Sequence, residues 1–260
     1  MYSLVYFSPT GNALHLTKIL ADHLDSDQVD IQALEFVDPN QLKPDQHLVL
    51  IYPVHGFNAP RTVKRFVKAL PSGLYDSISL IGVGSMTAWL NGAVSLELRN
   101  KLNQKGYPIV VDEILAMPLT FIMAIPDKAA YHCIDESEKR IIEIGHAIVE
   151  GKASQSKVAG KSKVVNFLGK IEKPAARLFG LELHANNNCT SCGTCWENCP
   201  EKNIKKNSKG KPHFGFSCIM CMRCIYNCPE KAISPRFSKF IPIRKGYDLK
   251  KFRPPLKLDS

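Results

Sequence analysis

The stretches CTSCGTCWENCP at residues 189–200 and CIMCMRCIYNCP at residues 218–229 decide the fold of the C-terminal part of the chain. Both have the spacing C-x2-C-x2-C-x3-C-P, so the chain contains an internal repeat. A short loop that carries three thiolates can hold three corners of an iron–sulfur cubane, and the fourth ligand must then come from elsewhere. The repeat therefore predicts metal ligation by eight of the nine cysteines.

Zinc binding and disulfide bonds fit the spacing of these cysteines less well than iron–sulfur clusters do. A pair of zinc sites prefers C-x2-C pairs that are separated by a longer stretch, whereas here four cysteines follow one another in a single run. The cysteines of each run are also too close together for a disulfide framework between distant loops, and the chain shows no export signal. The ninth cysteine, Cys133, falls in a predicted helix and is interpreted as a plain core or surface residue.

The segment from Asn188 to Ser234 resembles bacterial-type ferredoxins with two [4Fe-4S] clusters. Both Cys-Pro pairs are followed by Glu-Lys, and Ala232-Ile233 completes an ending common in that family. In this family the fourth cysteine of each run serves the other cluster. The resemblance thus implies one cluster held by Cys189, Cys192, Cys195 and Cys228, and a second held by Cys199, Cys218, Cys221 and Cys224.

The first 150 residues alternate between apolar strand-like runs and segments of helical periodicity. Strands are expected at residues 3–7, 29–34, 47–54, 79–83 and 107–116, and helices from about 12 to 24, then at 60–70, 91–105 and 127–150. Such alternation predicts a parallel sheet that helices cover on both sides.

The first strand is followed by Ser8-Pro9-Thr10-Gly11-Asn12, directly before the first helix. Backbone N–H groups at a helix N-terminus lack partners within the helix, and the helix dipole favours an anion there. The loop is a candidate phosphate site, although Thr10 and Asn12 would also suit a plain helix cap. It lacks the Gly-Lys-Ser/Thr of nucleoside triphosphate loops and the glycine-rich dinucleotide pattern.

The same loop resembles the first loop of flavodoxins, T/S-x-T-G-N-T, with Ser8, Thr10, Gly11 and Asn12 in register and Ala13 in place of the last Thr. The resemblance implies an α/β fold, a flavodoxin-like doubly wound parallel five-stranded sheet, followed by a small α+β ferredoxin-like 2[4Fe-4S] domain. It also implies an FMN site completed by loops after the third and fourth strands. The candidate residues in those loops are Pro53, His55, Gly56, Phe57, Asn58, Gly84, Ser85, Met86, Thr87 and Trp89.

Phe57 and Trp89 are the candidates to flank the flavin, because a large apolar face on a loop needs a partner. The alternative is that both pack against neighbouring loops. His55 is a candidate for the flavin edge, or else a polar surface residue. Residues 117–125 are expected to form the remaining wall of the site.

The charge of the chain is divided unevenly. Residues 1–150 hold 12 Lys and Arg against 17 Asp and Glu, whereas residues 151–260 hold 22 against 7. We expect an FMN-binding domain at 1–150, a basic linker at 151–184, a ferredoxin domain at 185–235 and a basic C-terminal tail at 236–260. The opposite net charges are expected to attract the two domains, while Lys202, Lys205, Lys206 and Lys209 offer a surface to an acidic partner.

Both resemblances together favour an electron-transfer oxidoreductase similar to flavodoxin-ferredoxin fusions of anaerobic microbes. It would relay single low-potential electrons between two [4Fe-4S] clusters and FMN, and exchange them with an unidentified redox partner protein. The alternative is a flavin-dependent reductase of a small molecule, such as a quinone, fed by the clusters. Nucleic acid is not expected as a partner, because the basic residues form no recognised reader motif. The absence of a long apolar run predicts a cytoplasmic protein without a membrane span, and the oligomeric state is left open.

Overall fold

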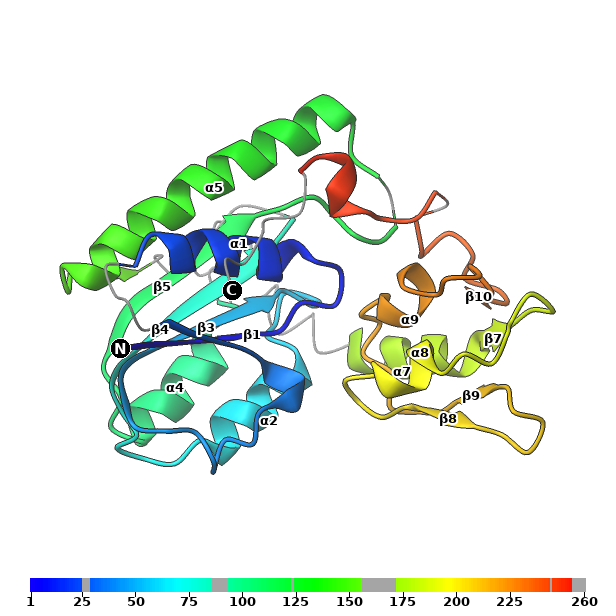
Figure 1. The fold of residues 1–260 in the computed structure, drawn as a ribbon, viewed down its shortest axis with the longest axis horizontal. Coiled ribbons are helices and arrows are strands. Elements are labelled where there is room, and N and C mark those ends of the chain that lie inside the picture. The colour runs from blue at the N-terminus through cyan, green and yellow to red at the C-terminus, as the bar shows by residue number, and fades with distance from the viewer. Residues whose placement is uncertain (25–28, 86–92, 123, 156–171, 244, 254–260) are drawn as a thin grey trace.

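The computed structural model describes residues 1–24, 29–85, 93–122, 124–155, 172–243 and 245–253. The chain folds into two units that lie side by side, a large α/β unit and a smaller unit that carries the cysteine runs (Figure 1). Among the helices of these described segments, none is both long and apolar enough to cross a membrane.

The larger unit is built on a parallel sheet with the strand order β2-β1-β3-β4-β5-β6. Its strands are β1 (Tyr2–Tyr6), β2 (Val29–Ala33), β3 (Asp45–Pro53), β4 (Tyr75–Gly84), β5 (Ile109–Ala116) and β6 (Ser154–Gln155). The order 2-1-3-4-5 of the first five strands is that of flavodoxin-like sheets. The predicted fold is therefore confirmed, and the two-residue β6 adds a short sixth strand beside β5.

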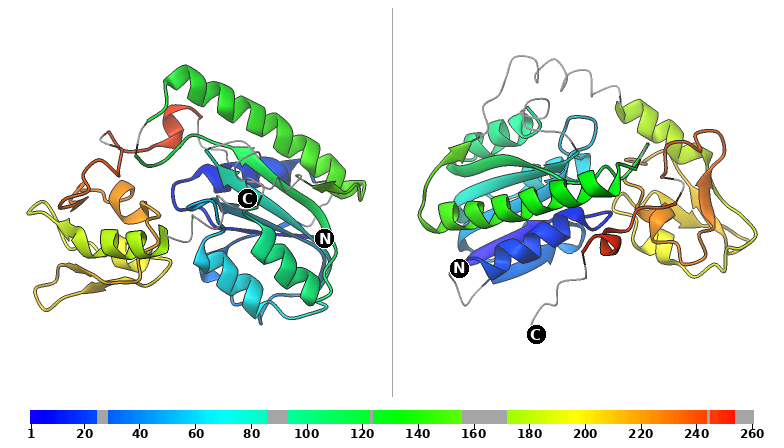
Figure 2. Two further views of the ribbon diagram at one scale, coloured as in Figure 1. Left: turned by 180° about the vertical axis from the view of Figure 1, so that it is seen from behind. Right: turned by 90° about the horizontal axis from the view of Figure 1, so that it is seen from above.

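Helices cover both faces of the sheet, as the strand–helix alternation predicts (Figures 1 and 2). One face carries α1 (Asn12–Asp22) and α5 (Asp127–Val149), and the other carries α2 (Arg61–Ala69) and α4 (Leu96–Gln104). The central strand β3 is apolar on both sides: Leu48 and Leu50 enter one core, and Val49 and Ile51 enter the other. Burial on both faces explains why its sequence is a continuous apolar run.

The smaller unit is an α+β module with two short antiparallel ladders. Its elements are α7 (Glu172–Glu182), β7 (Leu183–Ala185), α8 (Thr194–Glu197), β8 (Ile204–Lys206), β9 (Pro212–Phe214), α9 (Arg223–Tyr226) and β10 (Ile233–Pro235). Strand β7 pairs with β10, and β8 pairs with β9. Phe179 of α7 and Leu183 of β7 join the core of this module, so the chain from α7 onward packs as part of it.

Two buried side chains tie the units together. Glu201, whose side chain is 1% exposed, receives ion pairs from Arg61 and Arg65 of α2 and a hydrogen bond from Thr62. Arg223 of the smaller unit forms an ion pair with Glu35 of the larger unit. Each unit therefore contributes both an acidic and a basic side chain to the contact between them. These specific ion pairs add to the general attraction that the opposite net charges predict.

The C-terminal segment returns from the smaller unit to the larger one (Figure 1). The N–H of Ile122 donates to the carbonyl of Ile241 at 2.5 Å, and the one-turn helix η3 (Leu249–Lys251) lies near the N-terminus of α1. Lys251 then pairs with Asp127, and Arg253 pairs with Glu138 of α5. The predicted basic tail thus pairs with acidic side chains of α5 in the larger unit.

Candidate cofactor sites

The loop between β1 and α1 presents a helix N-terminus to the carboxyl end of the sheet. Gly11 is the N-cap of α1 with a φ of 100°, a left-handed conformation that glycine adopts without strain. Gly11 has no side chain to cap the helix, and the simple capping role considered for Thr10 and Asn12 is not seen. Ser8 caps the first turn instead, since its hydroxyl accepts the N–H of Leu14, the third residue of α1, at 3.0 Å.

The side-chain amide of Asn12 is hydrogen-bonded to two neighbouring segments of the chain. Its side-chain nitrogen donates to the carbonyl of Pro118 at 3.2 Å, and its oxygen accepts the hydroxyl of Tyr247 at 2.5 Å. Burial raises the pKa of Tyr247, which keeps this hydroxyl protonated as a donor. Asn12 therefore joins the first loop to the loop after β5 and to the C-terminal segment.

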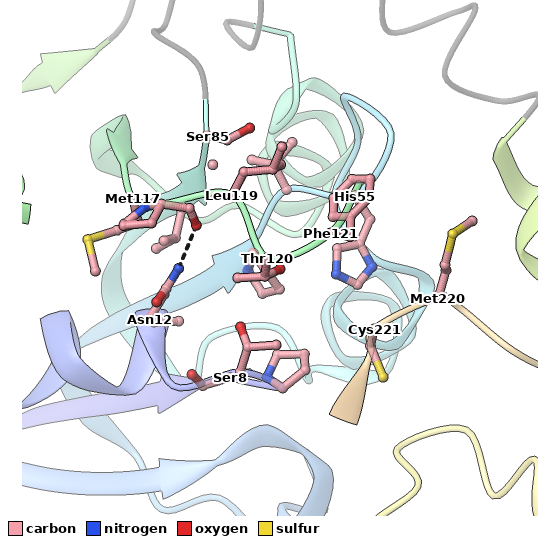
Figure 3. Close-up of a pocket in the computed structure, with 18 residues that line it drawn as sticks. Ser8, Asn12, His55, Ser85, Met117, Leu119, Thr120, Phe121, Met220 and Cys221 are labelled. Carbon is pink, nitrogen blue, oxygen red and sulfur yellow. Dashed lines mark hydrogen bonds between the residues drawn. The ribbon is translucent and has the colours of Figure 1, made fainter. Parts of the chain in front are cut away.

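A cleft lies where β1, β3, β4 and β5 end (Figure 3). This is the position at which open parallel sheets bind ligands. Of the predicted residues, the cleft is lined by Ser8, Thr10, Asn12, Ala13, Pro53, His55, Gly84 and Ser85. The expected wall after β5 is present as Met117, Pro118, Leu119, Thr120 and Phe121. Met86, Thr87 and Trp89 lie outside the described residues.

The loop after β3 closes on itself as a tight turn. His55 and Asn58 exchange two backbone hydrogen bonds of 2.9 Å, and the residues between them, Gly56 and Phe57, have φ values of 50° and 58°. Two successive left-handed residues are typical of a type I′ turn. Gly56, Phe57 and Asn58 do not line the cleft, and the aromatic ring that does line it in the described chain is that of Phe121.

His55 is the one cleft residue with an unpartnered buried polar atom among the side chains that the structure describes. Its Nδ1 is buried without a hydrogen-bond partner. Burial lowers the pKa of His55 to about 4, so the ring is neutral at pH 7. A neutral imidazole with an open nitrogen can exchange a hydrogen bond with a polar group of a bound ligand. Figure 3 shows it close to Phe121, on the side of the cleft where Cys221 lies.

The smaller unit gathers its eight clustered cysteines around two separate cavities. One is lined by Cys189, Cys192, Cys195 and Cys228, and the other by Cys199, Cys218, Cys221 and Cys224. Each cavity thus combines three cysteines of one run with the last cysteine of the other run. The two cavities thus group the cysteines in the same way as the ligand sets that the resemblance implies, and the ligand sets themselves stay a prediction.

Each of these cavities presents four cysteine thiols. Four thiolates are the ligand set that a [4Fe-4S] cluster uses. Burial raises the pKa of Cys218 to about 11 and that of Cys221 to about 12, so cluster assembly must displace their protons.

The cleft and the second cysteine cavity share residues. Met220 and Cys221 line both spaces, and they reach the cleft from the smaller unit (Figure 3). Arg223, two residues further on, donates to the carbonyl of Ser8 at 3.1 Å and to that of Asn198 at 3.2 Å. The candidate phosphate loop and the second cluster site are thus held together by one buried guanidinium.

Residues 188–233 match the sequence profile of the family described as a 4Fe-4S dicluster domain. This segment is an iron–sulfur domain. The match lies within the smaller unit and includes all eight cysteines that line the two cavities. No curated protein matches the chain in sequence.

Solved structures similar to the chain include several flavodoxins. One is a flavodoxin from Streptococcus pneumoniae TIGR4, which has 18% identity and a TM-score of 0.41 over 57% of this chain and 99% of that one. Flavodoxin 2 from Bacillus cereus has 21% identity and a TM-score of 0.43 over 57% and 97%. Megasphaera elsdenii flavodoxin has 18% identity and a TM-score of 0.42 over 58% and 99%. At these scores the strand order of the sheet, and not the similarity, establishes the flavodoxin-like fold.

Sequence reasoning missed the contribution of the dicluster domain to the cleft. Met220, Cys221 and Arg223 lie more than 200 positions from the first loop, and no local pattern relates the two segments. Glu201 directly follows the first cysteine run and Arg223 lies inside the second, and the nearby charged residues Glu197, Lys202 and Glu230 are exposed. No pattern in the sequence separates the first two residues from the other three.

Proposed function

We propose that the protein is an electron-transfer flavoprotein that relays single electrons between two [4Fe-4S] clusters and FMN. The observation that carries the proposal is Cys221, which lines both the second cysteine cavity and the cleft at the carboxyl end of the flavodoxin-like sheet. No other protein layer needs to separate the two cofactors at that point. When bound, the clusters exchange one electron at a time and the flavin accepts one or two.

The residues present fit a flavin phosphate at the first loop. Gly11 allows a close backbone approach, and the positive end of the dipole of the 11-residue helix α1 favours an anion. Thr10 lines the cleft beside it and can add a hydroxyl donor. His55 and Phe121 would flank the ring system, and the open Nδ1 of His55 offers it a hydrogen bond.

The protein's own contribution to the transfer is positioning and exclusion of water. Arg223 fixes the distance between the first loop and the second cluster site through the carbonyls of Ser8 and Asn198. Its ion pair with Glu35 is nearly buried, with both side chains about 10% exposed or less. A buried pair with several hydrogen bonds specifies one arrangement of the two units, because breaking it leaves a charge without a partner.

Analysis of anaerobically purified protein tests the cofactor inventory. We expect about eight iron and eight sulfide per chain, as two cubane clusters require, and about one FMN. Iron and sulfide at half this level would leave one cluster only, and zinc in their place would refute the proposal. If no flavin binds, the first unit has only a structural role.

The environment of His55 also supports a second function, the reduction of a small molecule. A neutral histidine with an unpartnered nitrogen in the cleft also suits the hydrogen bonding of a small substrate, such as a quinone, above the flavin. In that case a quinone added to the reduced protein should oxidise it with saturation kinetics. A rate that stays linear in quinone concentration would favour the carrier function, because it indicates collision without a binding site.

A further inference from the structure

The positive charges of the first unit are concentrated on one of its faces. Seven of the 12 Lys and Arg in residues 1–150 lie in two short stretches, Arg61 to Lys68 and Arg99 to Lys105. These stretches belong to α2 and to α4 with the residue that follows it. A unit that is acidic as a whole therefore carries a basic face on the side of α2 and α4.

A groove runs between these two helices. It is lined by Arg61, Lys64, Arg65, Lys68, Lys101 and Glu97, together with Asn100 and Gln104. Five cations thus face Glu97 within the groove and Glu201 at its end, which leaves three positive charges in excess. Lys68 and Lys101 are exposed, and neither has an ion pair among those of the described residues.

The groove leads directly to the second cluster site. Arg61 at its end donates to the carbonyl of Ser217 at 2.7 Å, and Ser217 precedes Cys218 in the chain. The carboxylate that Arg61 and Arg65 bind belongs to Glu201, two residues after Cys199. Both contacts attach the groove to loops that carry ligands of the same cysteine cavity.

Beyond this point the surface becomes apolar. Phe216 is 52% exposed with the guanidinium of Arg177 over its ring at 5.5 Å, and Leu178 and Leu181 of α7 are 62% and 53% exposed. Helix α7 is packed tightly against the cluster loop, since a Cβ built on Gly180 would lie 2.4 Å from the Cβ of Cys218. Exposed aromatic and aliphatic side chains beside arginines are typical of protein interfaces.

We propose that the groove between α2 and α4, Phe216 and the exposed face of α7 form one docking surface for an acidic redox partner protein. The surface is called the α2–α7 surface below. Helix α2 lies on the side of the first unit that faces α7, so a single partner can span both parts (Figures 1 and 2). The groove attracts acidic side chains, and the apolar part supplies the desolvated centre that a short-lived complex needs.

This inference deepens the proposed function and rests on it. Each encounter transfers one electron from the reduced partner to the iron–sulfur site of Cys199, Cys218, Cys221 and Cys224. The partner loses one electron and the site gains one, with no bond formed or broken. Cys221 also lines the cleft, whereas the cavity of Cys189, Cys192, Cys195 and Cys228 shares no lining residue with it, so an electron that enters here arrives beside the candidate flavin site.

The test uses the holoprotein and an acidic plant-type [2Fe–2S] ferredoxin as the probe. Binding is followed by fluorescence anisotropy of labelled ferredoxin, and the rate constant of electron transfer by stopped-flow absorbance. In a Lys68→Glu/Lys101→Glu double variant we expect association at least about tenfold slower at low salt, with the difference shrinking at 0.5 M salt. A Leu178→Gln/Leu181→Gln double variant should raise the dissociation constant severalfold at both salt concentrations.

The matched control is Lys206→Glu/Lys209→Glu, which makes the same charge change on the exposed β8–β9 hairpin. The proposal would be overturned if the hairpin variant slowed association as much as the groove variant or more. That result would indicate that the partner binds at the hairpin. Unchanged binding in the groove variant would overturn it as well. Photoreduction with a deazaflavin, which needs no protein partner, shows separately whether electrons reach the flavin. Loss of that internal step would count against the proposed function rather than against the α2–α7 surface.

Discussion

At the residue scale, the proposed flavin site depends on a few short side chains around the first loop. Thr10 lines the cleft, whereas the hydroxyl of Ser8 is already engaged by the N–H of Leu14. Thr10 is therefore the hydroxyl best placed to meet a phosphate.

Replacing Thr10 with Val should weaken FMN binding by about 1 to 3 kcal/mol, because one hydrogen bond to a charged group is lost in a poorly hydrated loop. A flavin titration of the apoprotein measures the difference. Thr17→Val is the matched control, since the Thr17 hydroxyl bonds the carbonyl of Ala13 within α1 and does not line the cleft. Equal affinities of wild type and Thr10→Val would remove Thr10 from the site.

Cys199 tests the exchange of ligands between the two cysteine runs. It follows Cys195 in the first run, yet the structure places it in the cavity of Cys218, Cys221 and Cys224. A Cys199→Ser variant should perturb the cluster of the second run and leave the signal of the other cluster intact. Electron paramagnetic resonance of the reduced variant distinguishes the two. Perturbation confined to the cluster of Cys189, Cys192 and Cys195 would contradict the exchanged assignment.

The buried His47 should make the stability of the larger unit sensitive to acid. Its ring is buried between the hydroxyls of Ser77 and Ser79, and burial lowers its pKa to about 4, with Asp45 opposing the shift. Between pH 6.5 and 4 the unfolded chain takes up a proton that the folded chain does not, so stability falls as the pH falls through this window. The full effect is at most about 3 kcal/mol.

The measurement is the urea midpoint for loss of far-UV circular dichroism at several pH values. A His47→Gln variant should have a flatter dependence on pH between 6.5 and 4 than wild type. Parallel curves for the two proteins would show that another group controls the acid response.

At the element scale, α7 supports the second cluster site through a close helix–loop contact. The Cβ of an alanine at position 180 would lie 2.4 Å from the Cβ of Cys218 and 3.1 Å from the carbonyl of Gly215. Neither neighbour is the flexible end of a side chain, so the loop must move.

A Gly180→Ala variant should therefore lose much of one cluster, which lowers the iron content from about eight toward about four per chain. The loss should fall on the cluster of Cys199, Cys218, Cys221 and Cys224. Leu181→Ala is the control on the same helix, because that side chain is 53% exposed. Full iron content in Gly180→Ala would mean that α7 can shift away without cost to the site.

Elements of the first unit were predictable because their signals are local. An apolar run such as Leu48 to Ile51 and the helical spacing of Leu16 and Leu20 are each visible within a few residues. Strand β7 was not predicted, since it has three residues and acquires its partner β10 about 50 positions later. Phe57 illustrates the same limit, because the turn at His55 to Asn58 decides which side chains of the loop reach the cleft.

At the scale of the whole molecule, the cofactor sites become one system only through contacts between distant segments. Glu201 joins α2 to the dicluster domain, Arg223 joins the first loop to the second cluster site, and Tyr247 joins the C-terminal segment to Asn12. Composition predicted attraction between the halves but not these pairs, which require the three-dimensional arrangement. The proposed function requires that this arrangement lets electrons pass from the cluster of Cys199, Cys218, Cys221 and Cys224 to the flavin within one chain.

Rapid photoreduction of the anaerobic holoprotein tests this internal electron transfer. Absorbance is followed after a light pulse at wavelengths that separate the clusters from the flavin, over a tenfold range of protein concentration. We predict that the clusters are reduced first and that the flavin then follows at a rate independent of protein concentration, because the transfer is internal. Flavin reduction whose rate rises in proportion to protein concentration, or clusters that stay reduced beside an oxidised flavin, would show that electrons do not pass between the two sites within one chain.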